Sequence, residues 1–171
     1  RIGYNHESLD EWLPILLKEN LPALTVHLRT RKEMSLVAAH WELAERVVHL
    51  RNTYAPNTRI IGNGDVRDLA DATEKADAGG WDGIMLGRAI FGNPWVFTGK
   101  ELSDISREDR LAALLQLAEY FDELRPKKSF HILKKHFKAF VNGWPGAAEL
   151  RGELMEAEDI GQLRTIITRL V

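Results

Sequence analysis

The chain of 171 residues is long enough to bury a hydrophobic core, and its 44% hydrophobic and 28% charged residues are typical of a globular protein. A net charge of −2 gives the whole chain no attraction for nucleic acid, so a surface that binds it must be a local cluster. Cysteine is absent, which excludes disulfides, thiolate metal sites and a cysteine nucleophile from this stretch. No apolar run approaches the roughly 18 residues of a membrane span, and no signal peptide opens the chain. We therefore expect a cytoplasmic protein with no membrane segment and no metal.

The chain opens on Arg1-Ile2-Gly3-Tyr4-Asn5, without an initiator methionine. These residues resemble the end of a strand that runs into a loop, without the body of that strand. We therefore expect the chain to be a fragment of a longer protein.

Helical and strand patterns alternate over the first part of the chain. Apolar residues repeat at helical spacing in three segments, and three other segments are short β-prone runs. The expected helices cover residues 8–19, 37–50 and 66–78, and the expected strands cover residues 23–27, 60–62 and 83–87. Ser8 and Asp65 are suited to cap the first and third helices. This alternation with short links predicts βαβ units and a parallel sheet.

The pattern changes after Pro94. From about Ser106 onward the chain contains helical patterns only. The expected helices cover residues 107–124, 129–142 and 159–171, with turns at residues 125–126 and 143–146. We therefore expect an α/β domain over residues 1–100 and a small all-α domain over residues 105–171.

Three polar motifs follow the three expected strands. They are His27 with Arg29 and Arg31, then Asn63-Gly64-Asp65, then Gly87-Arg88. Because parallel strands end at the same edge of a sheet, we expect these residues to converge there. Glycine lets main-chain N–H groups approach a ligand, a helix that begins after Asp65 would direct its positive end to the same place, and Arg88 adds a charged donor. Together these features predict a phosphate site.

Each motif also has a purely structural interpretation. Asn63-Gly64-Asp65 on its own is equally a tight turn with a helix cap. A histidine at a strand end, such as His27, is often a hydrogen-bonded structural residue. The joint placement of the three motifs at successive strand ends favours the binding site.

These motifs resemble, in order and spacing, consecutive signatures of the bacterial tRNA-dihydrouridine synthase family. The matching segments are 25–31, 60–65, 82–89 and Gly92-Asn93-Pro94-Trp95, followed by Lys134-Lys135-His136 and residues 146–151. The resemblance covers essentially the whole chain. It implies an α/β fold that is the C-terminal portion of a (β/α)8 TIM barrel, with its last three strands, followed by a small all-α helical domain that binds tRNA.

The same resemblance implies an enzyme that contains FMN and uses NADPH to reduce the C5–C6 double bond of uridine in tRNA. The residues that would bind the cofactor are His27, Asn63, Gly64, Asp65, Gly87 and Arg88. The catalytic cysteine of the family would lie upstream of Arg1, so no catalytic residue is expected in this chain. Leu28 stands where the family usually has glycine, which affects the expected contacts of the arginines that follow it.

A cluster of positive charge lies between residues 125 and 151. It contains seven arginines and lysines against the single acidic residue Glu149. Such a cluster is typical of a phosphate-backbone contact, although a solvated helix face has the same composition. With two arginines from the strand-end loop, the expected RNA-binding residues are Arg29, Arg31, Lys127, Lys128, Lys134, Lys135, Lys138 and Arg151.

Two alternative functions remain open at this point. Another FMN-dependent TIM-barrel dehydrogenase, of the dihydroorotate dehydrogenase type, would share the phosphate loops but would not need a basic helical tail. A non-catalytic RNA-binding remnant would keep the tail and bind no flavin. Flavin content therefore separates the two enzymes from the remnant.

Overall fold

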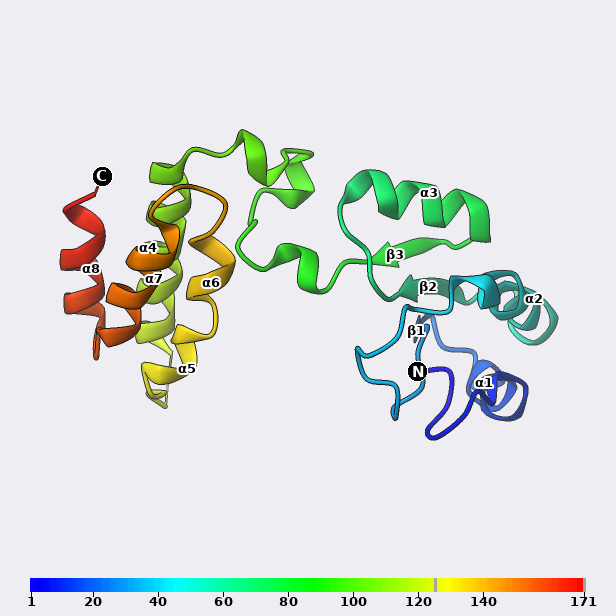
Figure 1. Cartoon of the computed structure of the whole chain (residues 1–171). Coiled ribbons are helices and arrows are strands. Elements are labelled where there is room, and N and C mark those ends of the chain that lie inside the picture. Colours follow the sequence, from blue (N-terminus) through cyan, green and yellow to red (C-terminus); the bar gives the residue numbers. More distant parts are fainter. Residues whose placement is uncertain (125, 171) are drawn as a thin grey trace. The chain divides into compact units, whose positions relative to one another are not determined.

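The computed structural model describes residues 1–124 and 126–170 (Figure 1). Arg125, in an expected turn of the basic segment, and Val171, at the end of the last expected helix, lie outside the described residues. The chain divides into two compact units, Arg1–Ala89 and Ile90–Val171, and each has a hydrophobic core of its own. None of the described helices is long and apolar enough to cross a membrane.

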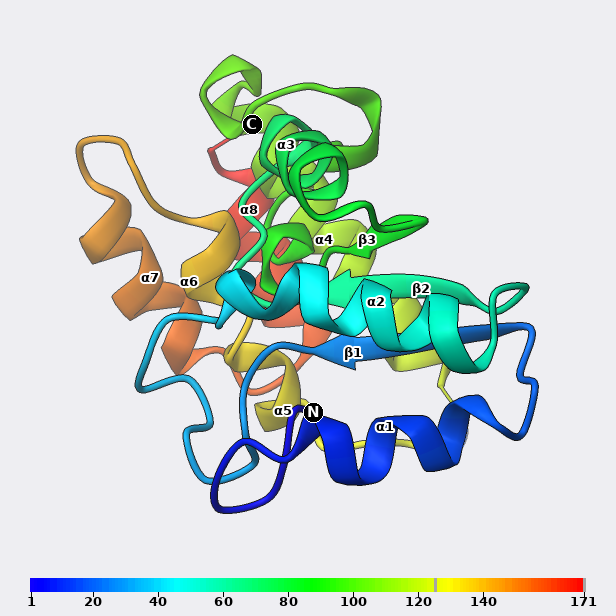
Figure 2. The same cartoon turned by 90° about the vertical axis from the view of Figure 1, so that its right-hand side faces the viewer.

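The first unit is a mixed α/β structure around a three-stranded parallel sheet (Figure 2). The strands lie side by side in chain order, as β1 (Ala23–His27), β2 (Arg59–Asn63) and β3 (Gly83–Met85). The helices are α1 (Leu9–Leu17), α2 (Ala44–Tyr54) and α3 (Leu69–Gly79), with short 3-10 turns at Trp41–Leu43 and Arg88–Ile90. The predicted parallel sheet built from βαβ units is confirmed.

One face of the sheet packs against the helices. Val26 and Ile60 are fully buried in the core, and α2 contacts β2 and both neighbouring helices. Gly62 is needed on this face because a Cβ there would come within 3.1 Å of the rings of Trp41 and Trp81. Successive side chains of a strand point to opposite faces, so the pairing row formed by His27, Asn63 and Met85 faces away from the helices.

Two helices of this unit begin later than predicted, for identifiable reasons. Residues 37–40 are not helical, and two of them are tied to the strand-end loops: the N–H of Ala39 donates to the Asp65 carboxylate at 3.0 Å and that of His40 to the Leu28 carbonyl at 2.7 Å. The predicted N-cap at Asp65 is wrong. Helix α3 begins at Leu69, and its N-cap is Asp68, whose carboxylate accepts the N–H of Asp71 at 2.7 Å.

The described residues of the second unit contain helices and no strand. The helices are α4 (Arg107–Glu123), α5 (His131–Lys134), α6 (Phe137–Phe140), α7 (Ala147–Glu156) and α8 (Ile160–Thr168), with 3-10 turns at Val96–Thr98 and Leu102–Asp104. Their buried side chains, among them Leu114, Phe137, Leu154 and Leu163, form one core. The single helix predicted over residues 129–142 is wrong, since two short helices occupy that segment.

The N-cap of α3 generates a prediction about stability. Asp68→Ala should lower the free energy of unfolding by about 1 kcal/mol, because the N–H of Asp71 would lose its acceptor. The matched control is Asp77→Ala, an exposed aspartate in the last turn of the same helix. Removing a negative charge at that end should leave stability unchanged or raise it slightly. Urea denaturation of the two variants measures the difference, and equal effects would contradict the assignment of the cap.

Candidate functional site

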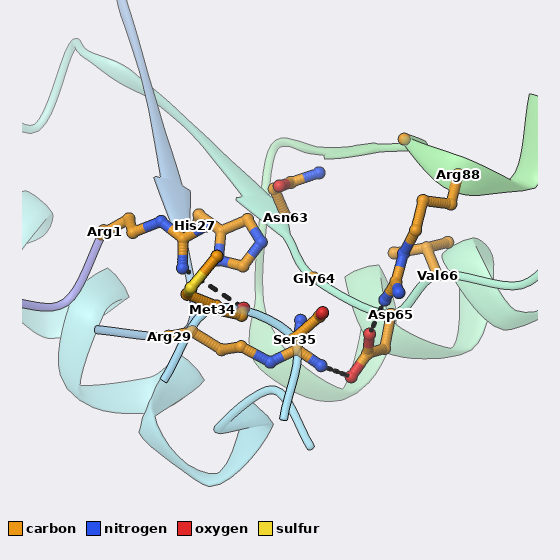
Figure 3. A pocket seen from close by; sticks show the side chains of 11 residues that line it. Arg1, His27, Arg29, Met34, Ser35, Asn63, Gly64, Asp65, Val66 and Arg88 are labelled. Atoms are coloured by element: carbon orange, nitrogen blue, oxygen red, sulfur yellow. Dashed lines mark hydrogen bonds and ion pairs between the residues drawn. The ribbon is translucent and has the colours of Figure 1, made fainter. Parts of the chain in front are cut away.

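A pocket of about 350 Å³ opens at the edge of the sheet where the three strands end (Figure 3). It lies entirely within the first unit. All six residues predicted to bind the cofactor line it, namely His27, Asn63, Gly64, Asp65, Gly87 and Arg88. The predicted convergence of the three strand-end motifs is therefore confirmed.

Strand register explains this convergence. His27 and Asn63 are direct pairing partners, and so are Asn63 and Met85, so the last residues of the three strands form one row. The Asn63 side-chain amide donates a hydrogen bond to the Met85 carbonyl at 2.8 Å. This bond fixes the end of β3 to β2, and the chain then continues directly into Gly87 and Arg88.

Asp65 lies at the centre of the site's charged network. Its carboxylate forms an ion pair with Arg29 and accepts a hydrogen bond from Arg88 at 2.6 Å (Figure 3). It also accepts the N–H of Ala39 at 3.0 Å. The Arg29 guanidinium in particular holds the pKa of Asp65 below its usual value. Asp65 is therefore ionised at neutral pH and interacts with both arginines at once.

The loop that carries Asp65 is tightly constrained. Gly64 has φ of 137°, and a Cβ there would lie 2.7 Å from the Cβ of Ala39, so only glycine fits without displacement. Its carbonyl accepts the indole N–H of Trp41 at 2.9 Å. Asp65 itself has φ of 48°, a left-handed conformation that aspartate tolerates better than most residues. These contacts set the direction of the Asp65 carboxylate.

The electrostatics of the pocket suit an anion. Its charged lining residues are Arg1, Arg29 and Arg88 against Asp65. Burial, followed by the positive charges of Arg1 and Arg29, lowers the pKa of His27, so its imidazole is neutral at pH 7. The buried Nδ1 of His27 has no hydrogen-bond partner among the described residues. The site thus offers positive charge together with a neutral imidazole.

Two residues are placed to meet a ligand. The Arg88 side chain is 64% exposed, so its guanidinium has N–H donors that face the solvent. Beside it, a Cβ on Gly87 would meet nothing within 4 Å, which leaves open space next to the main chain. Contrary to prediction, the N-terminus of α3 does not line the pocket: the helix begins at Leu69, and the N–H of Asp71 in its first turn donates to the Asp68 carboxylate.

Four lining residues were not predicted. Arg1, Met34, Ser35 and Val66 also border the pocket. Met34 and Ser35 belong to the loop after β1, where no spacing pattern separates a residue that faces the pocket from its neighbours. Their position after a strand end was the one signal in the sequence.

The predicted RNA-binding arginines of the first unit occupy different environments. Arg29 is only 3% exposed, and besides its ion pair with Asp65 its Nε donates to the Val37 carbonyl at 2.7 Å. This burial argues against the predicted contact with RNA. Arg31 is exposed, and its guanidinium lies over the ring of Tyr4 at 5.6 Å.

In the second unit, two of the predicted cations are engaged by main-chain carbonyls. The Lys134 ammonium donates to the Met155 carbonyl at 2.5 Å, and Arg151 donates to the Val141 carbonyl at 2.8 Å. The remaining four are exposed, namely Lys127, Lys128, Lys135 and Lys138. Among them Lys127 lies 3.4 Å from the Asp122 carboxylate, a weak surface ion pair.

Comparison with known proteins identifies the family. The sequence model of dihydrouridine synthase (Dus) matches residues 1–168. A probable tRNA-dihydrouridine synthase of Staphylococcus aureus (strain N315) is 41% identical over 172 residues, covering 98% of this chain and 52% of the relative. A probable tRNA-dihydrouridine synthase 2 of Bacillus subtilis (strain 168) is 38% identical over 172 residues, with the same coverage. The chain thus spans about half the length of the curated relatives that it matches. The chain belongs to the dihydrouridine synthase family.

Proposed function

We propose that the protein containing this chain is a tRNA-dihydrouridine synthase, an FMN enzyme that uses NADPH to reduce uridine in tRNA to 5,6-dihydrouridine. The observation that carries this proposal is the pocket at the strand ends, which gathers His27, Asn63 and Arg88 in a member of the Dus family. Membership of that family decides against an enzyme of the dihydroorotate dehydrogenase type. Flavin binding by the full-length protein separates this enzyme from a remnant that binds RNA alone.

In this proposal the first unit is the C-terminal part of a (β/α)8 barrel. Three parallel strands with helices on one face and a site at their carboxyl ends are the elements of such a barrel. The other face of the sheet carries the row of His27, Asn63 and Met85, and Met85 is 45% exposed. In a complete barrel this row points into the barrel interior, where further strands would cover it.

The pocket residues fit a flavin with a phosphate group. Arg88 offers exposed guanidinium donors, and the open space beside Gly87 admits a phosphate close to the main chain. Asp65 is ionised and would repel a phosphate, so its role is to orient Arg88 rather than to bind the cofactor. His27 lines the same pocket with a neutral imidazole.

FMN, when bound, would supply the hydride-transfer chemistry between nicotinamide and pyrimidine, and this chain's residues would supply anchoring and electrostatics. The neutral His27 can either donate or accept a hydrogen bond at the ligand. The sequence contains no cysteine, so the cysteine acid that the family resemblance implies belongs to another part of the protein.

The second unit is proposed to bind tRNA through its exposed lysines. Lys128, Lys135 and Lys138 are exposed, and Lys127 is exposed with a weak surface ion pair to Asp122, whereas Lys134 and Arg151 are held by carbonyls of the unit itself. A backbone contact by four lysines is independent of base sequence. It would hold tRNA without selecting the uridine.

Arg88→Ala should weaken FMN binding by about ten-fold, the lower end for a charged hydrogen bond because the side chain is largely exposed. The matched control is Arg59→Ala, an exposed arginine at the opposite end of β2. Flavin fluorescence titration of the full-length apoprotein measures both. An FMN affinity equal to that of the control would remove Arg88 from the site, and a wild-type protein that binds no flavin would support the remnant.

Asp65→Asn tests the role of the carboxylate in the same assay. If Asp65 opposed the phosphate through its charge alone, the variant would bind FMN more tightly. We expect weaker binding, because Arg88 would lose its anchor, together with a loss of about 3 kcal/mol in stability, because the buried Arg29 would lose its charged partner. Tighter binding with unchanged stability would contradict this role.

The proposed tRNA contact predicts a dependence on salt. Lys135→Gln combined with Lys138→Gln should flatten the slope of log K against log salt by about 0.7 to 0.9 per lost phosphate contact. The control combines Lys18→Gln with Lys100→Gln, two exposed lysines outside the basic segment, and makes the same change in net charge. Equal slopes for the two double variants would show that the lysines of the segment are only a solvated face.

A further inference from the structure

The second unit contains a groove that the proposed function does not use. It has a volume of about 350 Å³ and three walls, formed by residues 90–94, by α4 and by the segment of α5 and α6. The aromatic and polar lining residues are Phe91 on the first wall, Gln116 and Tyr120 on the second, and His136 and Phe140 on the third. Its lining is mainly apolar, and the rings of Phe91 and Tyr120 are more than half exposed.

The first wall is fixed by an unusually close contact. Gly92 has φ of 74°, and a Cβ there would lie 2.0 Å from the carbonyl oxygen of Ala139 in α6. No other residue could bring residues 90–94 so near this helix without displacing it. The contact seats the ring of Phe91 edge-on to that of His136, with centroids 5.6 Å apart. The aromatic walls are therefore formed before any ligand arrives.

Polar atoms lie at the edges of this apolar space. The Gln116 amide donates to the Tyr120 hydroxyl at 3.4 Å, and each keeps further capacity to donate or accept. Burial, with the nearby charge of Lys135, lowers the pKa of His136, so its imidazole is neutral at pH 7. A ligand with flat apolar faces and a polar rim matches this arrangement, and a nucleobase has both.

The charge around the groove favours a ligand that carries phosphate. None of the described residues that line it has a carboxylate. Lys135 and Lys138 are exposed and belong to the same short segment as the lining residues His136 and Phe140, and the charge of Lys135 reaches the His136 imidazole. A base in the groove would therefore have cations close to its flanking phosphates.

We propose that this groove receives an unpaired nucleobase of the bound RNA, which stacks on Phe91 and Tyr120 while Lys135 and Lys138 meet its phosphates. RNA-binding proteins commonly hold unstacked bases on aromatic side chains in this way. The inference rests on the proposed function only in taking RNA as the ligand. It adds a base-binding subsite to the second unit, separate from the pocket at the strand ends.

The test uses full-length protein in which Phe91→Leu is combined with Tyr120→Leu. Both side chains are largely exposed, so the variant should fold, and leucine keeps apolar surface while it removes the rings. Phe97→Leu is the matched control, because this ring is 66% exposed in the same unit but does not line the groove. The probes are an unmodified tRNA transcript, which has unpaired bases, and a blunt RNA duplex, which has none.

The double variant should bind the tRNA at least about five-fold more weakly, with unchanged affinity for the duplex and an unchanged salt slope, because stacking is lost and phosphate contacts remain. Unchanged tRNA affinity, or an equal loss for Phe97→Leu or for the duplex, overturns the inference and leaves the proposed function intact. A wild-type protein that binds no tRNA overturns both. Sedimentation velocity that shows a dimer lost in the double variant assigns the groove to a second copy, which also overturns the inference.

Discussion

The arrangement of the strand-end site depends on the ionised carboxylate of Asp65. This carboxylate contacts the loop after β1 through Arg29 and Ala39, and the segment after β3 through Arg88. Arg29 is almost fully buried, and a buried charge is tolerated only when it is paired and hydrogen-bonded. The pair with Asp65 therefore permits the burial of Arg29. The same carboxylate also holds Arg88 at the pocket. The loops that follow β1, β2 and β3 are thus held together by the charge of Asp65.

This constraint explains which parts of the site could be read from the sequence. Polar motifs at successive strand ends converge because parallel strands end together, so the membership of the pocket could be predicted. The role of Asp65 could not. An aspartate after a strand can cap a helix or pair with a cation, and the deciding partner, Arg29, lies 36 residues away. Asp68 has the same capping chemistry, and its carboxylate accepts the N–H of Asp71, so Asp68 is the N-cap of α3.

In the second unit, too, the sequence alone could not predict which cations are exposed or where every helix begins. A count of cations over residues 125–151 treats Lys134 and Lys135 alike, although the first is bound to a carbonyl and the second is exposed. Helices α4 and α8 begin at side-chain caps, Ser106 and Asp159, that the sequence displays. Helix α7 begins after Gly146, which has no side chain to cap it, and this helix was not predicted from the sequence.

The two cavities differ in the forces that each can apply. At the strand ends, fixed cations and a constrained loop favour an anion held in one orientation, which is what a cofactor requires. In the groove of the second unit, aromatic rings with neutral polar edges favour a flat group, and the strength of stacking does not depend on salt. The attraction between the nearby lysines and phosphate does weaken as salt is added. An RNA bound both by stacking in the groove and by attraction of its phosphates to the lysines would keep part of its affinity when salt screens the charges. That residual affinity reports on base contacts alone, so a groove that holds a base differs measurably from a merely basic surface.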